Sequence, residues 1–173
     1  MHARQFWKTV TMDGTDFLDR VLALLAAHEI RYCVIGGQAV NAYADPLVSL
    51  DLELIVAVEQ IAEAEQFLRE GFVVEHFEHS LNVSEPGSDV RIWLQTDPRY
   101  FAFVARSTMG DVLGLRLPVA RIEDVLQGKI WAALDSARRP SWRQKDLADI
   151  ARLLEIRPTL RPAIPPEILA RLV

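Results

Sequence analysis

This sequence of 173 residues lacks several features that would assign it to a protein class directly. Cys33 is the only cysteine, so an intramolecular disulfide is excluded and a reducing, cytoplasmic location is expected. The N-terminal stretch MHARQFWKTVTMDG has no apolar run typical of a secretory signal, and no run is long enough to span a membrane. Excess basic charge is also absent. The formal net charge is -5, so broad binding to nucleic acid or to an anionic membrane is not expected.

What the chain does have is apolar residues, which make up 50% of it, and these suffice for the core of one domain over residues 1–173. Strands are expected to alternate with helices in the first two-thirds, and helices dominate the last third. This order predicts an α/β (α+β) fold with a mixed β-sheet core at about 13–120 and a helical C-terminal part at about 121–173. The hydrophobic pattern predicts helices over 13–30, 38–44, 58–70, 99–106, 122–135 and 143–155, and strands over 31–35, 50–57, 72–79 and 89–95.

Two acidic residues interrupt the apolar run LDLELIVA. Residues i and i+2 of a strand point to the same side, so Asp51 and Glu53 are expected to present neighbouring carboxylates on one face. A half-exposed acidic strand face is one interpretation. The functional interpretation is a site for a divalent cation, because Mg²⁺ binds a few carboxylates and leaves its other positions to water and substrate phosphates.

Two glycines end the preceding apolar run. A strand that ends in Gly36 and Gly37 and opens a helix can bring bare backbone N–H groups close to a phosphate. A tight turn is the alternative explanation. A phosphate cradle and a pair of metal-binding carboxylates on nearby strands together form the two halves of a metal-assisted phosphoryl-transfer site.

These motifs resemble the signature of the DNA polymerase β-like nucleotidyltransferase superfamily. Thirteen residues separate Gly37 from Asp51 in IGG…LDLELI. The stretch GKIWAALDSARRPSWRQKDLADIARLLE is similar to the abortive-infection toxins and to related uncharacterised bacterial nucleotidyltransferases. The resemblance covers roughly residues 30 to 155.

The resemblance implies the transfer of a nucleotide from an NTP to an acceptor. Asp51 and Glu53 would hold Mg²⁺ (or Mn²⁺), and Gly36 and Gly37 would cradle the β- and γ-phosphates. Lys129 and Lys145 would neutralise phosphate charge, and Asp146 would orient or activate. An acceptor such as a nucleic-acid end or a protein is implied, as is a cognate partner in a toxin–antitoxin or phage-defence pair.

The sequence departs from the superfamily pattern on a later strand, where a third acid is usual. The stretch SDVRIWL offers Asp89 for that role, or leaves Arg91 in its place, and alternation alone does not fix the register. Leu47 and Ser49 also stand where related proteins often have Arg and Thr. These departures leave two alternative hypotheses open. One is a non-catalytic module on the same fold that binds a nucleotide or a protein, and the other is a phosphate-binding regulatory subunit.

A basic cluster precedes the last long helix. Arg138, Arg139, Arg143 and Lys145 surround Trp142, which predicts either a solvated loop or a surface that holds a nucleotide or a nucleic-acid end. Lys145, Asp146 and Asp149 have a second interpretation as the polar face of an amphipathic helix.

Overall fold

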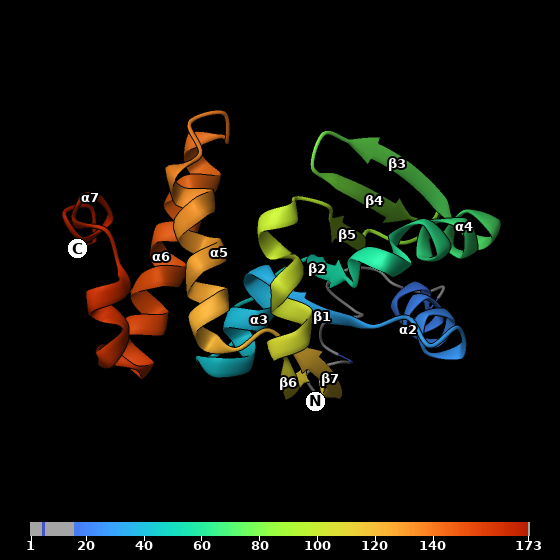
Figure 1. Ribbon diagram of the computed structural model, residues 1–173, viewed down its shortest axis with the longest axis horizontal. Coiled ribbons are helices and arrows are strands. Elements are labelled where there is room, and N and C mark those ends of the chain that lie inside the picture. Colours follow the sequence, from blue (N-terminus) through green and yellow to red (C-terminus); the bar gives the residue numbers. More distant parts are fainter. Residues whose placement is uncertain (1–4, 6–15, 173) are drawn as a thin grey trace.

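The computed structural model describes residue 5 and residues 16–172, and it shows a mixed seven-stranded sheet flanked by helices (Figure 1). The strand order is β3-β4-β5-β2-β1-β7-β6. The pairs β2–β5 and β1–β7 are parallel, and the other pairs are antiparallel. The predicted α/β fold with a mixed sheet is confirmed. The strands are β1 (Tyr32–Ile35), β2 (Asp51–Val56), β3 (Val73–Phe77), β4 (Ser80–Ser84), β5 (Arg91–Gln95), β6 (Thr108–Val112) and β7 (Leu115–Val119).

Helices lie on both sides of the view in Figure 1, and α3 lies in the middle beside β1. In Figure 1, α5 and α6 stand side by side on the left, and α2 and α4 lie on the right. The α-helices among the described residues are α2 (Phe17–Ala27), α3 (Gly36–Tyr43), α4 (Ile61–Gly71), α5 (Ile122–Leu134), α6 (Pro140–Ile156) and α7 (Pro166–Leu169). The 3-10 helices are η1 (Val58–Gln60), η2 (Pro98–Arg106) and η3 (Pro158–Ala163).

The structure corrects several predicted boundaries. Residues 72–79 do not form one strand, because the chain reverses after Phe77 and returns as β4, a strand that the sequence prediction missed. Two further strands were missed, β6 at residues 108–112 and β7 at residues 115–119, and they pair with each other as an antiparallel hairpin. The predicted helix at 13–30 is observed as α2, and its first three residues lie outside the described part of the chain.

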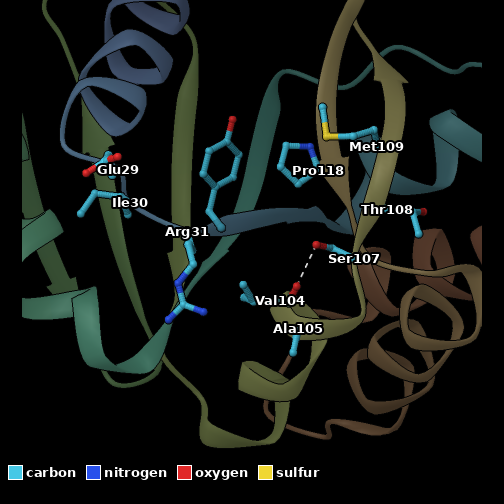
Figure 2. Close-up of a pocket in the computed structure, with 10 residues that line it drawn as sticks. Glu29, Ile30, Arg31, Val104, Ala105, Ser107, Thr108, Met109 and Pro118 are labelled. Carbon is cyan, nitrogen blue, oxygen red and sulfur yellow. Dashed lines mark hydrogen bonds between the residues drawn. The ribbon is translucent and has the colours of Figure 1, made fainter.

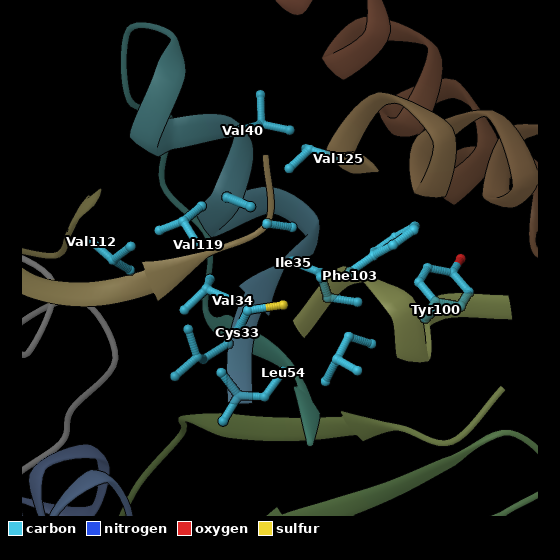
Figure 3. Close-up of a cluster of buried hydrophobic side chains, with 14 of the residues drawn as sticks. Cys33, Val34, Ile35, Val40, Leu54, Tyr100, Phe103, Val112, Val119 and Val125 are labelled. Carbon is cyan, nitrogen blue, oxygen red and sulfur yellow. The ribbon is translucent and has the colours of Figure 1, made fainter. Parts of the chain in front are cut away.

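The core lies where β1, β2 and β7 meet α3, α5 and η2. Cys33, Val34 and Leu54 are fully buried, and Figure 3 shows them clustered with Phe103 and Tyr100 of η2. The alternation predicted for β2 is observed, since Leu52 and Leu54 are fully buried while Asp51 and Glu53 face the other side. The packing of Tyr100 and Phe103 against this core therefore holds η2 beside the acidic face of β2.

No helix in the described part of the chain is both long and apolar enough to cross a membrane.

Candidate active site

A cleft of about 650 Å³ opens between the acidic face of β2 and the helices α5 and α6. It receives side chains or backbone from the β1–α3 junction, β2, β5, the β3–β4 hairpin, η2, α5 and α6. The lining residues are Ile35, Gly36, Gly37, Ser49, Asp51, Glu53, Phe77, Ser80, Trp93, Gln95, Tyr100, Phe103, Asp124, Val125, Gly128, Lys129, Ala132, Arg138, Trp142, Lys145 and Asp146.

The glycine pair lies at the start of α3, immediately after β1. Gly36 has a φ of +67°, a conformation that side chains disfavour. A Cβ on Gly36 would lie 1.6 Å from Glu53 Oε2, so the carboxylate lies directly against the glycine backbone. A Cβ on Gly37 would meet Ser49 Oγ at 3.5 Å. The first turn of α3 therefore presents bare backbone beside the acidic pair.

The two acids of β2 lie next to β5. Asp51 pairs with Arg91 and Glu53 pairs with Trp93 in the parallel register. Asp51 remains exposed at the mouth of the cleft. Burial nevertheless raises the pKa of its carboxyl above the ordinary value, against the opposing effects of Lys145, of a hydrogen bond from Trp93, and of Arg91. The carboxylates are thus adjacent, with an indole and two cations around the outer one.

Lys129 of α5 lies at the base of the cleft and is 7% exposed. Its Nζ donates to Asp146 Oδ1 at 3.0 Å and lies 2.7 Å from Asp149 Oδ2. Burial alone would lower the pKa of Lys129, but Glu53, Asp149 and Asp146 outweigh burial and raise it. Lys129 is therefore held as a cation, facing the acids of β2 from the opposite wall.

Asp146 also holds a second cation. Arg138 Nε donates to Asp146 Oδ2 at 2.9 Å, and Asp146 is only 1% exposed. Because both of its oxygens are paired with cations, Asp146 is suited to positioning Lys129 and Arg138 rather than to accepting a proton from a substrate.

The predicted basic cluster forms a compact aromatic surface. The guanidinium groups of Arg138 and Arg139 lie 5.3 Å and 5.0 Å from the ring centroid of Trp142. Trp142 is 48% exposed and lines the cleft together with Lys145. This surface offers a stacking plane flanked by positive charge, which suits a nucleotide.

The residues indicated by the sequence that line the cleft include Gly36, Gly37, Asp51, Glu53, Lys129, Lys145, Asp146 and Arg138. Arg139 is not among the lining residues, and its guanidinium lies against the ring of Trp142. Asp89 is not brought there. It precedes β5 and is exposed, and the register places Arg91, not Asp89, beside Asp51.

Sequence reasoning missed a hydrogen-bonded link between α6 and the loop that leads to β2. Arg152 donates to Asp149 Oδ1 at 2.8 Å and to Asn41 Oδ1 at 2.9 Å, and also to the backbone oxygen of Asp45. Asn41 in turn bonds to both backbone groups of Leu47. The network that holds Lys129 therefore extends to the loop before Asp51. Its only sequence signal was Asp149, which fitted the polar face of a helix equally well.

The residues present fit one divalent cation better than a pair of cations. No group of three His, Cys, Asp or Glu side chains able to hold a metal occurs among residue 5 and residues 16–172. Two neighbouring carboxylates suffice for a single Mg²⁺ that completes its coordination with water and substrate phosphates. The bare backbone at Gly36 leaves room for phosphate beside Glu53.

A second hollow of about 510 Å³ lies elsewhere, between the start of β1, the end of η2 and the β6–β7 edge (Figure 2). Its charged groups are Glu29 and Arg31, and Arg31 forms an ion pair with Glu59. The Ser107 hydroxyl is bonded to the backbone oxygen of Val104 at 2.8 Å. This hollow lacks the converging acids, cations and bare backbone of the first cleft.

The fold is shared with solved nucleotidyltransferase structures. The chain is similar to ANT(2'')-Ia in complex with adenylyl-2''-tobramycin, with 16% identity and a TM-score of 0.60 over 91% of this chain and 98% of that chain. It is also similar to lincomycin-bound LnuA, a lincosamide antibiotic adenylyltransferase, with 11% identity and a TM-score of 0.55 over 79% of this chain and 95% of that chain.

A third similar structure is an antigenic nucleotidyltransferase-like protein from Paracoccidioides brasiliensis, with 16% identity and a TM-score of 0.51 over 86% of this chain and 75% of that chain. No family model matches the sequence, and a comparison with curated proteins finds no match. At these identities the likeness concerns the fold alone.

Proposed function

We propose that this protein is a metal-dependent nucleotidyltransferase that transfers a nucleotide from an NTP to an acceptor. The observation that carries the proposal is the meeting of three elements in one cleft: the bare backbone at Gly36, the adjacent acids Asp51 and Glu53, and the opposing cation Lys129. Transfer of this kind demands little covalent work from the protein. It demands positioning and stabilisation of phosphate charge.

Each element has a role in this proposal. Asp51 and Glu53 would hold Mg²⁺, or Mn²⁺, which when bound neutralises charge on the triphosphate. The backbone of Gly36 and Gly37 would contact phosphate oxygens at the start of α3. Lys129 and Lys145 would face the phosphates as cations.

The remaining residues of the cleft position the nucleotide. Asp146 would hold Lys129 and Arg138 in place, since its oxygens bond to both. The surface of Arg138, Arg139 and Trp142 would stack against the base. Asp89 would need to move from its exposed place before β5 to take part, so we assign it no role.

The proposal is tested by thermal unfolding with each NTP, with and without Mg²⁺. A ligand that binds only the native state stabilises it by about 2.7 kcal/mol at one hundred times its Kd. We expect a Mg²⁺-dependent rise in Tm with at least one NTP, and loss of that rise in the Asp51→Asn, Glu53→Gln double variant. The matched control is Glu63→Gln with Glu70→Gln, which removes two exposed acids from α4. Equal nucleotide transfer by the acid-pair variant would refute the assignment.

A second candidate function is a non-catalytic module that binds a nucleotide or a protein. It is favoured by β5, which places Arg91 and Trp93 rather than a carboxylate beside the acid pair. Its signature would be a rise in Tm with an NTP that does not depend on Mg²⁺, or no rise at all.

The cellular role is a further part of the proposal. The similarity of residues 128–155 to abortive-infection nucleotidyltransferases supports a toxin with a cognate antitoxin as partner. Expression in a bacterial host is expected to arrest growth, and the Asp51→Asn, Glu53→Gln variant is expected to permit growth. Arrest by both proteins would contradict the toxin role.

A further inference from the structure

Two cations lie near Asp51, where an attacking group would approach. Arg91 neighbours Asp51 in the β2–β5 register, Lys145 of α6 lines the cleft, and both charges oppose the effect of burial, which raises the pKa of the Asp51 carboxyl. Arg91 is exposed, and its Nη1 donates to the backbone oxygens of Ser88 and Val90, at 3.2 Å and 3.0 Å. These bonds direct the guanidinium without neutralising its charge.

Among the described residues that line this cleft, none is a free base. Besides the metal-binding pair, two carboxylates line it. Asp124 is held by Arg106 at 2.9 Å and by Arg121 at 3.1 Å, and Asp146 is held by Lys129 and Arg138.

The other lining groups do not supply a base either. Burial raises the pKa of the Tyr100 phenol, which keeps it neutral, and no histidine lines the cleft within the described ranges 5 and 16–172. A general base typically accelerates such a reaction by ~10²–10⁴-fold. An alcohol acceptor would therefore lack the group that removes its proton.

We propose that the acceptor is an oxyanion, either a phosphate monoester or a carboxylate, that docks between Arg91 and Lys145. This inference rests on the proposed function and names its substrate class. An anionic oxygen can attack without losing a proton, so the reaction needs no base in the cleft. The positive charges of Arg91 and Lys145 would attract an anionic acceptor, whereas a neutral alcohol would gain little from them.

The reaction balances without a proton acceptor. An oxygen of the phosphate monoester or carboxylate forms a new bond to the α-phosphorus of the NTP. The bond between the α-phosphorus and the bridging oxygen breaks, and pyrophosphate leaves with that electron pair. The product is a phosphoric anhydride from a phosphate monoester, or an acyl phosphate ester from a carboxylate.

The first test is binding by calorimetry, with protein saturated with Mg²⁺ and the α,β-methylene analogue of the NTP that raised the Tm. The probes are glycerol 1-phosphate, glycerate and glycerol, which differ in the group that would attack. We expect glycerol 1-phosphate or glycerate to bind, and Arg91→Ala to weaken that binding at least tenfold. The control Arg161→Ala, an exposed arginine of η3, is expected to leave it unchanged. The stronger of the two anionic probes identifies the source of the oxyanion.

The second test measures pyrophosphate release from the cleavable NTP. The rate with the anionic probe is expected to be nearly constant from pH 7 to pH 9, whereas reaction of an alcohol without a base would rise about tenfold per pH unit. Equal binding or faster turnover of glycerol would overturn the inference, as would the absence of binding by both anionic probes. If the NTP itself does not bind, the proposed function is refuted. If the NTP binds but neither anionic probe binds better than glycerol, only the oxyanion acceptor is refuted.

Discussion

The carboxylate of Glu53 occupies the space that any side chain on residue 36 would need. The separation of 1.6 Å between Glu53 Oε2 and a Cβ on Gly36 leaves no room even for a methyl group. The glycine and the acid, which are far apart in the sequence motif, therefore form one structural unit. The glycine allows the acid to lie against the start of α3, where phosphate would approach.

Gly36→Ala is expected to destabilise the protein by roughly 1–3 kcal/mol, because the φ of +67° disfavours a side chain and the methyl group would displace Glu53. Denaturant unfolding measures the stability change. The displaced acid should also abolish the Mg²⁺-dependent rise in Tm with an NTP.

Gly71→Ala is the matched control. Gly71 ends α4, and nothing lies within 4 Å of a Cβ placed on it. A change within about 1 kcal/mol is expected there. Similar losses at both glycines would show that general backbone flexibility, and not the contact with Glu53, determines the effect at Gly36.

The sequence predicted those parts of the fold that local pattern determines. Alternation along β2 identified its buried leucines and its acidic face correctly. The β3–β4 hairpin was missed because both strands are short and the turn after Phe77 contains neither glycine nor proline. Strand β6 was missed because three of its five residues are exposed, so it carries little hydrophobic signal.

The candidate site was predictable where its residues belong to a recognisable sequence motif, and the stretch 128–155 indicated Lys129, Arg138, Lys145 and Asp146 in this way. Gly36, Gly37, Asp51 and Glu53 form a spaced motif, and the structure brings them into one cleft. Which residue of β5 lies beside Asp51 depends on strand register, a tertiary property, so Asp89 and Arg91 were not distinguishable from the sequence. The ion pair of Lys129 with Asp149 likewise depends on how α5 packs on α6.

Lys129 compensates two buried carboxylates, because Asp146 and Asp149 are 1% and 3% exposed. Lys129→Met is expected to destabilise the protein by about 3 kcal/mol, since it leaves two buried acids with one cationic partner each. Arg138 and Arg152 are those remaining partners. Chemical denaturation at pH 7 measures the loss.

A surface ion pair provides the comparison for that variant. Arg157 lies 3.1 Å from Glu123, and the two side chains are 47% and 49% exposed. Arg157→Met is expected to cost less than about 1 kcal/mol, because water screens the pair. Losses of equal size at Lys129 and Arg157 would contradict the role of burial.

Asp97 caps η2 through its carboxylate. Its side chain accepts from the backbone N–H of Arg99 at 3.0 Å and from the Arg99 guanidinium at 2.7 Å. Hydrogen bonds from Arg99 lower the pKa of Asp97 below its ordinary value of 3.8. The helix that Asp97 caps carries Tyr100 and Phe103 into the wall of the cleft.

Asp97→Asn keeps a capping side chain and removes only the charge. A carboxyl with a lowered folded-state pKa stabilises the fold above its unfolded pKa, and this stabilisation is lost as the pH falls through the folded pKa. The variant should therefore be less stable than the original protein at pH 7, by at most about 1 kcal/mol because Arg99 is exposed. The difference should remain constant down to about pH 4 and close below it. Urea unfolding of both proteins from pH 7 to pH 3 measures this difference, and a gap independent of pH would show that the charge of Asp97 does not stabilise η2.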